Sequence, residues 1–251
     1  MKINFRQKII RLAGACLLLA STSAFITPAL SANPTVVELF TSQGCSSCPP
    51  ADAILGKLKL RDDVIALTFP VDYWDYLGWK DTLASPANSK RQRDYARARG
   101  DRQIYTPQMV INGRVHVIGS QQESIDKAIQ SVAKDDSVNI SMVADGDAIR
   151  LSVSSDSPTP SGSHDEVTLW LVLFKGAAAV KIGRGENRGN TITYNNVVRQ
   201  MTPIGMWEGK PMTINLPKAQ FVASGYDGCA VLLQRDNSHE IIAAAMMDNL
   251  K

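Results

Sequence analysis

The sequence has few of the residues that build metal centres and disulfide frameworks. Only three histidines and four cysteines occur among its 251 residues. The histidines, His116, His164 and His239, have no paired spacing, whereas a closed zinc site needs four cysteine or histidine ligands. One cysteine, Cys16, lies in an N-terminal leader, and the three that follow are too few for a framework of several bridges. We therefore predict no metal site and no disulfide-stapled mini-domain.

The N-terminal segment has the pattern of a secretory signal peptide. MKINFRQKIIRLAG carries four basic residues and no acidic one, the apolar run LAGACLLLASTSAFI follows, and small residues surround Ser31. We predict that residues 1–31 are cleaved and that Cys16 is removed with them. The alternative is an uncleaved anchor, because the apolar run approaches membrane-spanning length. After cleavage we expect an exported protein, periplasmic or secreted, with no stable membrane insertion.

The chain also lacks an excess of charge and several familiar catalytic motifs. Removing four leader bases from 27 leaves 23 Lys and Arg against 24 Asp and Glu, a net charge of −1. With no basic stripe interleaved with aromatic residues, the sequence argues against nucleic acid as a partner. It contains no nucleophile-elbow serine motif and no phosphate-cradling glycine loop. The oligomeric state is left open.

The order of expected elements changes near residue 136. Segments 35–42 and 63–72 are buried strands, and helical patterns lie at 49–60, 86–100 and 120–134. Two short strands in 105–120 are joined by Asn112-Gly113, a strong hairpin signal. Beyond residue 136, short strands separated by turn residues prevail. We predict an α/β domain at 33–135 followed by an all-β, sandwich-like domain at 136–251.

The segment TSQGCSSCPPAD, residues 41–52, places Cys45 and Cys48 between the first strand and the first helix. Unpaired N–H groups and the positive dipole end of a helix stabilise a thiolate there. Cys45 is the expected nucleophile, and Cys48 the thiol that resolves a mixed disulfide. Since proline fits the first helical position, Pro49 predicts a helix with Cys48 as its N-cap. A bent helix that includes both cysteines is the other geometry.

A second signature lies at Thr106-Pro107, just before the predicted hairpin. If this peptide bond is cis, the backbone of Thr106 would face the cysteines and could pair with an extended substrate. If the bond is trans, Pro107 is an ordinary proline at a strand start. The residue types alone leave both geometries open.

ELFTSQGCSSCPPAD and YTPQMVINGRVHVIG resemble the thioredoxin fold. Together with VDYWDYLGWKD and RGENRGNTITYNNVVR, they are similar to an uncharacterised family of secreted bacterial thioredoxin-like proteins. The resemblance implies a redox-active pair at Cys45 and Cys48 and a cis Pro107, and it implies no particular substrate. The chain departs from thioredoxin at Gly44, where tryptophan is usual, and at Glu38, which is one position farther from the first cysteine than thioredoxin's aspartate.

Several residues have two interpretations. Glu38, in an apolar strand, is either a proton relay to Cys48 or an ordinary glutamate at a strand edge. Trp74 and Trp79 are either a substrate platform or core residues. RGENRG, residues 184–189, is either a solvated loop or a contact for an anion or another domain. Cys229 is either a buried inert thiol or an acceptor of the disulfide.

We therefore expect an exported thiol–disulfide oxidoreductase that acts on the thiols and disulfides of other proteins, without a cofactor. Cys45 and Cys48 would carry the chemistry, and Thr106, Pro107, Trp74 and Trp79 would contact the substrate. One alternative is a Cu(I) carrier that adds His116 to the two cysteines. Another is a non-enzymatic binding module with a permanent Cys45–Cys48 bridge, although so small a loop adds little stability.

Overall fold

The computed structural model describes residues 33–132, 137–155 and 166–250. The predicted signal peptide, with Cys16, lies outside these residues, and so does His164. Among the described residues no helix is both long and apolar enough to cross a membrane. The helices and strands follow in this order: β1 (Thr35–Thr41), α1 (Pro49–Leu58), β2 (Val64–Pro70), a 3₁₀ turn (Asp75–Leu77), α2 (Pro86–Arg99), β3 (Gln108–Ile111), β4 (Val115–Ile118), α3 (Gln122–Ser131), β5 (Val138–Asp145), β6 (Ala148–Ser155), β7 (Val167–Lys181), β8 (Thr191–Met206), β9 (Met212–Leu216), α4 (Lys218–Ala223), β10 (Gly228–Arg235) and β11 (Ile241–Met247).

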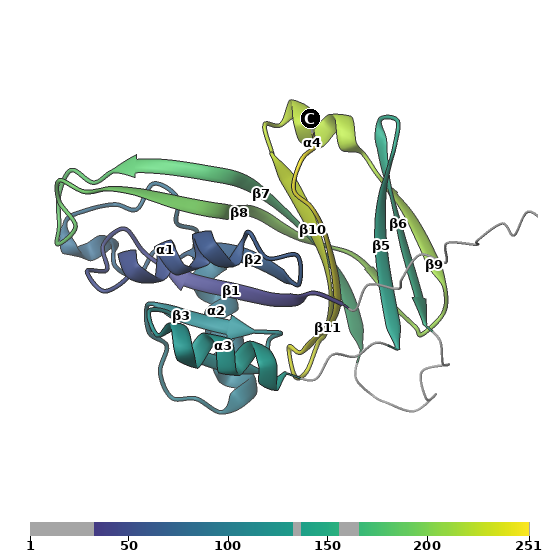
Figure 1. Cartoon of the computed structure of the whole chain (residues 1–251), viewed down its shortest axis with the longest axis horizontal. Coiled ribbons are helices and arrows are strands. Elements are labelled where there is room, and N and C mark those ends of the chain that lie inside the picture. Colours follow the sequence, from purple (N-terminus) through teal and green to yellow (C-terminus); the bar gives the residue numbers. More distant parts are fainter. Residues whose placement is uncertain (1–32, 133–136, 156–165, 251) are drawn as a thin grey trace, which may run out of the picture. The chain divides into compact units, whose positions relative to one another are not determined.

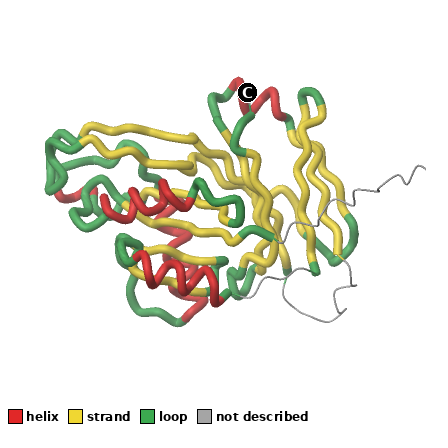
Figure 2. Tube along the Cα trace, viewed as in Figure 1, coloured by secondary structure: helices red, strands yellow, loops and turns green. Residues whose placement is uncertain are grey.

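The protein is a mixed α/β structure built on one large sheet, with few helices (Figures 1 and 2). The eight strands of this sheet run in the order β11-β10-β7-β8-β2-β1-β3-β4. β1 and β2 are parallel, β3 and β4 form an antiparallel hairpin, and a second sheet of three strands has the order β5-β6-β9. On one face of β1 to β3, α1 and α3 cover an apolar core. The opposite face packs with Tyr95 of α2 and with alternate residues of β7 and β10.

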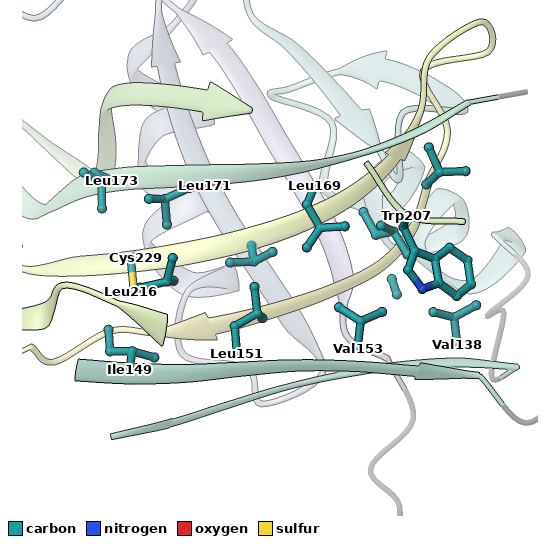
Figure 3. Packing of buried hydrophobic residues seen from close by; sticks show 14 of the residues in the cluster. Val138, Ile149, Leu151, Val153, Leu169, Leu171, Leu173, Trp207, Leu216 and Cys229 are labelled. Carbon is teal, nitrogen blue, oxygen red and sulfur yellow. The ribbon is translucent and has the colours of Figure 1, made fainter. Parts of the chain in front are cut away.

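The three-stranded sheet forms a sandwich with the β7, β10 and β11 end of the large sheet (Figure 3). Alternate residues of β6, including Leu151 and Val153, point into the shared core. Leu169 of β7 and Cys229 of β10 meet them from the other sheet. The two sheets thus share one apolar core.

The predicted boundary between residues 135 and 136 does not separate two bodies. The described residues from 33 to 250 form one compact unit, because β8 pairs with strands of both parts. This strand pairs with β7 along its length and also with β2, where Val197 lies opposite Thr68. The Asn196 side chain strengthens this junction by donating to the Ala66 carbonyl at 2.9 Å. The late strands thus continue the sheet of the early ones.

The β7–β8 hairpin extends past β10 and runs beside α1 (Figure 1). Lys59, at the end of α1, donates to the Gly176 carbonyl of β7 at 2.8 Å. At the other end, Ile182, Ile192 and Tyr194 form a small core with Trp79. Residues 182–190 form the loop that joins β7 and β8. This packing holds the loop against the loops around the cysteines.

Candidate functional site

The two cysteines lie in the loop between β1 and α1 and form a disulfide, with Cα atoms 5.4 Å apart. The helix begins at Pro49 with Cys48 as N-cap, as the proline at the first helical position predicted. The Cys48 carbonyl accepts from the N–H groups of Ala51 and Asp52 at 2.9 and 3.1 Å. Cys45 is outside the helix, and its carbonyl accepts from the Cys48 N–H at 3.2 Å.

Both cysteines are largely covered by protein. Cys45 is 2% exposed and Cys48 is 0% exposed. Between them Ser46 and Ser47 are exposed, and the Ser47 hydroxyl lies 3.5 Å from the Cys45 sulfur. The disulfide therefore presents little of its own surface to solvent, and the two serines beside it are the exposed part of this turn.

Gln43 is the hub that holds the cysteine loop, defined here as residues 42–48. Its backbone N–H donates to Asp81 at 2.8 Å, and its side-chain oxygen accepts from the Trp79 indole at 2.8 Å. Asn187, at the tip of the β7–β8 hairpin, donates to the carbonyls of Gln43 and Cys45, both at 2.9 Å. Three loops that are distant in sequence are thus joined by buried hydrogen bonds beside the disulfide.

The Thr106–Pro107 bond is cis, and it is connected to the cysteine loop through Trp74. The Trp74 indole donates to the Thr106 hydroxyl at 2.8 Å. The Cβ of Trp74 lies where a side chain on Gly44 would point, since a Cβ built on Gly44 would be 3.1 Å from it. A larger side chain at Gly44 would therefore meet Trp74, which comes from another loop and fills the space next to Gly44.

Glu38 is not placed beside the cysteines. Val37 and Leu39 pack in the core covered by α1, so that Glu38, between them, points to the opposite face of β1. There its carboxylate accepts from Arg91 at 2.7 and 3.2 Å and from the Tyr95 hydroxyl. The structure thus corrects the proton-relay interpretation: Glu38 is a buried, fully paired carboxylate on the face away from α1.

Asp52 of α1 is a buried carboxylate on the side of β1 where the disulfide lies. It follows Cys48 by one helical turn and is 2% exposed. Neither of its oxygens has a hydrogen-bond partner among the described residues. The same holds for the hydroxyls of Thr41, at the end of β1, and Tyr194, in β8.

Burial raises the pKa of Asp52 well above its usual range. The Thr41 hydroxyl is close enough to lower this pKa in part, and the negative charge of Asp81 raises it further. Burial also raises the pKa of Asp81, although hydrogen bonds from Gln43, Leu83 and Ala84 oppose that shift. Asp52 accordingly retains its proton to a higher pH than an exposed aspartate does.

The sequence missed Asp52 and Asn187. Asp52 had a signal, because an aspartate four residues after Cys48 lies on the same side of a helix that begins at Pro49. Asn187 had none beyond the charged pattern RGENRG, since its role depends on a contact between residues 142 positions apart in sequence.

Cys229 and His116 lie on other elements, β10 and β4. Cys229 is 0% exposed in the sandwich core, and burial raises its thiol pKa to about 12. The Nδ1 atom of His116 lies 2.9 Å from the Tyr105 hydroxyl, and burial lowers the pKa of this histidine. Within residues 33–132, 137–155 and 166–250, no group of three His, Cys, Asp or Glu residues could hold a metal ion.

A cavity of about 690 Å³ lies between α2 and the strands β2, β7, β8 and β10. Phe69 and Trp170 contribute apolar walls, and Arg91, Tyr95 and Gln234 contribute polar groups. Arg91 is tied to Glu38, Tyr95 and Gln234 by hydrogen bonds of 2.6 to 3.2 Å. The volume is typical of a site for a small molecule.

The comparisons with known proteins identify the family. Residues 36–234 match the family described as "Protein of unknown function (DUF1223)". The chain belongs to the DUF1223 family. The crystal structure of protein AGR_C_4864 from Agrobacterium tumefaciens is similar, with 36% identity and a TM-score of 0.74, covering 87% of this chain and 96% of that one.

A more distant structure shares the fold of this DUF1223 protein. HBP35 of Porphyromonas gingivalis aligns with a TM-score of 0.58 and 13% identity, covering 88% of this chain and 76% of that one. At this identity the likeness concerns the fold alone. No curated protein matches the chain.

Proposed function

We propose that this DUF1223 protein is an exported, thioredoxin-like thiol–disulfide oxidoreductase that acts on other proteins. The observation that carries the proposal is the Cys45–Cys48 disulfide at the exit of β1, with the unpaired, buried carboxyl of Asp52 one helical turn from Cys48. The order of β1, α1, β2, α2, β3, β4 and α3, with a cis proline before β3, agrees with a thioredoxin-like arrangement. Export rests on the predicted signal peptide, and outside the cytosol a disulfide persists.

The chemistry is a two-step exchange. In the reducing direction the Cys45 thiolate attacks one sulfur of a substrate disulfide, forms a mixed disulfide and expels the first substrate thiolate. The ionised form of Asp52 then takes the proton of the Cys48 thiol, and the Cys48 thiolate attacks the Cys45 sulfur and expels the second substrate thiolate. The protein pair loses two electrons and the substrate disulfide gains them. In the oxidising direction the steps run backward.

The surrounding loops have distinct tasks in this proposal. Thr106 and Pro107 present the substrate backbone, and Trp74 ties them to the cysteine loop through its 2.8 Å hydrogen bond. Trp79 holds Gln43 from the other side. Since Cys45 lies outside α1, the helix dipole acidifies it less than a thiol on the first turn.

A permanent disulfide in a binding module is the second candidate function. The near-complete burial of Cys45 and Cys48 favours it, and the cavity lined by Phe69 and Trp170 offers a binding site on another part of the fold. In that case the bridge would only fix the loop. The two functions differ in whether Cys45 ever exchanges partners with another sulfur.

Trapping experiments distinguish these candidates. A Cys48→Ser variant retains Cys45 but cannot resolve a mixed disulfide, so the oxidoreductase accumulates a covalent adduct when it is mixed with an oxidised protein substrate. Mass spectrometry should find the adduct at Cys45, and adding Cys45→Ser should abolish it, whereas Cys229→Ser should not. A Cys48→Ser protein that forms no adduct in its native state would exclude the enzyme and favour the binding module.

A further inference from the structure

The surface around the disulfide combines exposed apolar side chains with unpaired cations. Tyr76 and Leu77, on the turn after Trp74, are 79% and 40% exposed. Lys80, Lys181, Arg184 and Arg188 are exposed, and none of them forms an ion pair with a described residue. We call these four cations the basic rim.

Contacts of their neighbours place the basic rim beside the cysteine loop. Arg184 lies between Gly183 and Gly185, and a Cβ built on either glycine would lie 3.0 to 3.5 Å from Trp79. Arg188 follows Asn187, which binds the Cys45 carbonyl. Lys80 follows Trp79, whose indole binds Gln43, and Lys181 precedes Ile182, which packs in the same small core as Trp79.

The acids of the two loops do not balance this charge. Residues 75–80 and 181–188 contain the four cations of the basic rim against Asp75 and Glu186, which leaves a net charge of +2. The Asp75 carboxylate already accepts a hydrogen bond from the Asp81 N–H at 3.0 Å. The neighbouring acids Asp52 and Asp81 are buried. Local positive charge of this kind raises the encounter rate of a negatively charged partner.

Resting on the proposed function, we propose that the basic rim and the Tyr76–Leu77 pair select acidic peptide segments of partner proteins, with an apolar residue next to the reacting cysteine. The acidic side chains of the segment lie against the rim. Its apolar residue lies on Tyr76 and Leu77, which would otherwise stay in water. This selection compensates for the low exposure of Cys45, because it holds the substrate sulfur over Ser46 and Ser47.

The test compares two peptide disulfides that differ only in charge. Each is a homodisulfide of an eight-residue peptide with one cysteine and an adjacent leucine, and two glutamates in the first are lysines in the second. The purified protein, reduced with dithiothreitol and desalted, is mixed with each peptide, and the reaction is stopped with acid and followed by mass spectrometry. The peptide disulfide gains two electrons and gives two thiols, while Cys45 and Cys48 become the disulfide.

We expect the acidic peptide disulfide to react about tenfold faster at low ionic strength, and this ratio to shrink at high salt. The double variant Arg184→Ser/Arg188→Ser should bring the ratio close to one. Lys210→Ser/Lys218→Ser removes the same charge elsewhere and should leave the ratio unchanged. Tyr76→Ser should slow both peptides alike, whereas Leu60→Ser, at a side chain that is 81% exposed, should slow neither.

Equal rates for the two peptides, or an unchanged ratio in Arg184→Ser/Arg188→Ser, would overturn the selection of acidic segments while leaving the oxidoreductase intact. A reduced protein that reacts with neither peptide disulfide, and with no oxidised protein, overturns the proposed function itself. The two failures are therefore distinguishable.

Discussion

Replacing Asp52 by asparagine should make the protein more stable at neutral and alkaline pH. The folded protein encloses this carboxyl, which is 2% exposed and has no hydrogen-bond partner among the residues described. Ionising a buried polar group without a partner costs about 1–3 kcal/mol or more. Asparagine has nearly the same shape and carries no charge, so the variant avoids this cost.

The sign of the pH dependence follows from the raised pKa of Asp52. A carboxyl whose pKa is higher in the folded state binds its proton more tightly when folded. Its contribution to stability is therefore complete below the unfolded value of about 4, and it is lost as the pH rises toward the folded pKa. The stability difference between Asp52→Asn and the unchanged protein should grow across that range and then level off.

Urea unfolding from pH 4 to pH 8.5 measures this difference. At the alkaline end we expect Asp52→Asn to be more stable by about 1–3 kcal/mol, which raises the melting temperature by about 2–4 °C for each kcal/mol. Asp62→Asn, at an exposed aspartate, is the control and should change neither value. If Asp52→Asn destabilises the protein equally at every pH, ionisation of Asp52 does not lower the stability of the folded protein and the reasoning fails.

Three further predictions concern the groups around the site. Glu38→Ala should destabilise the protein by about 3–5 kcal/mol, because Arg91, whose side chain is 13% exposed, loses the carboxylate that balances its charge. The rate of disulfide exchange in the protein that remains folded should be unchanged; a selective loss of that rate would restore the relay interpretation. Asn187→Ala should cost about 1–3 kcal/mol in urea unfolding and should increase the reaction of Cys45 with iodoacetamide in the reduced protein, since two carbonyls lose their donor; unaltered alkylation would mean that the hairpin tip does not hold the loop. Cys229 should resist alkylation in the native protein at pH 8, because its pKa is raised to about 12 in the sandwich core, and should react only after unfolding; rapid native labelling, measured by mass spectrometry, would contradict that burial.

The early part of the fold could be predicted because its signals are local. Pro49 fixed the start of α1, Gly100 with its φ of 77° ends α2 where the pattern indicated, and Asn112-Gly113 turns the β3–β4 hairpin. The basic composition of residues 86–100 does not indicate that Tyr95 is buried on the inner face of α2. Arg91 is counted as a basic, exposed residue in the sequence pattern, yet it points inward because it pairs with the buried carboxylate of Glu38.

The way the late strands join the early ones, and the contacts of Asn187 with the cysteine loop, depend on residues that are distant in sequence. Local sequence patterns do not predict such contacts. One β-strand pattern describes both a strand of a separate sandwich and a strand such as β8, which pairs with β7 and β2 together. Glu38 of β1 is recognisable in the sequence as a charged residue within an apolar segment. The role of a buried carboxylate depends on the face of the sheet on which it lies. Glu38 points away from α1, whereas Asp52 belongs to α1 and lies on the same side as the disulfide.

The reduction potential of the Cys45–Cys48 couple tests the central claim most directly. The purified protein is equilibrated with dithiothreitol and glutathione buffers of known potential, acid-quenched and counted for free thiols at Cys45 and Cys48. The oxidoreductase account predicts reversible interconversion with a midpoint between about −120 and −270 mV, the range of disulfide-exchange enzymes. A bridge that stays closed below about −300 mV, or opens only when the protein unfolds, would contradict it.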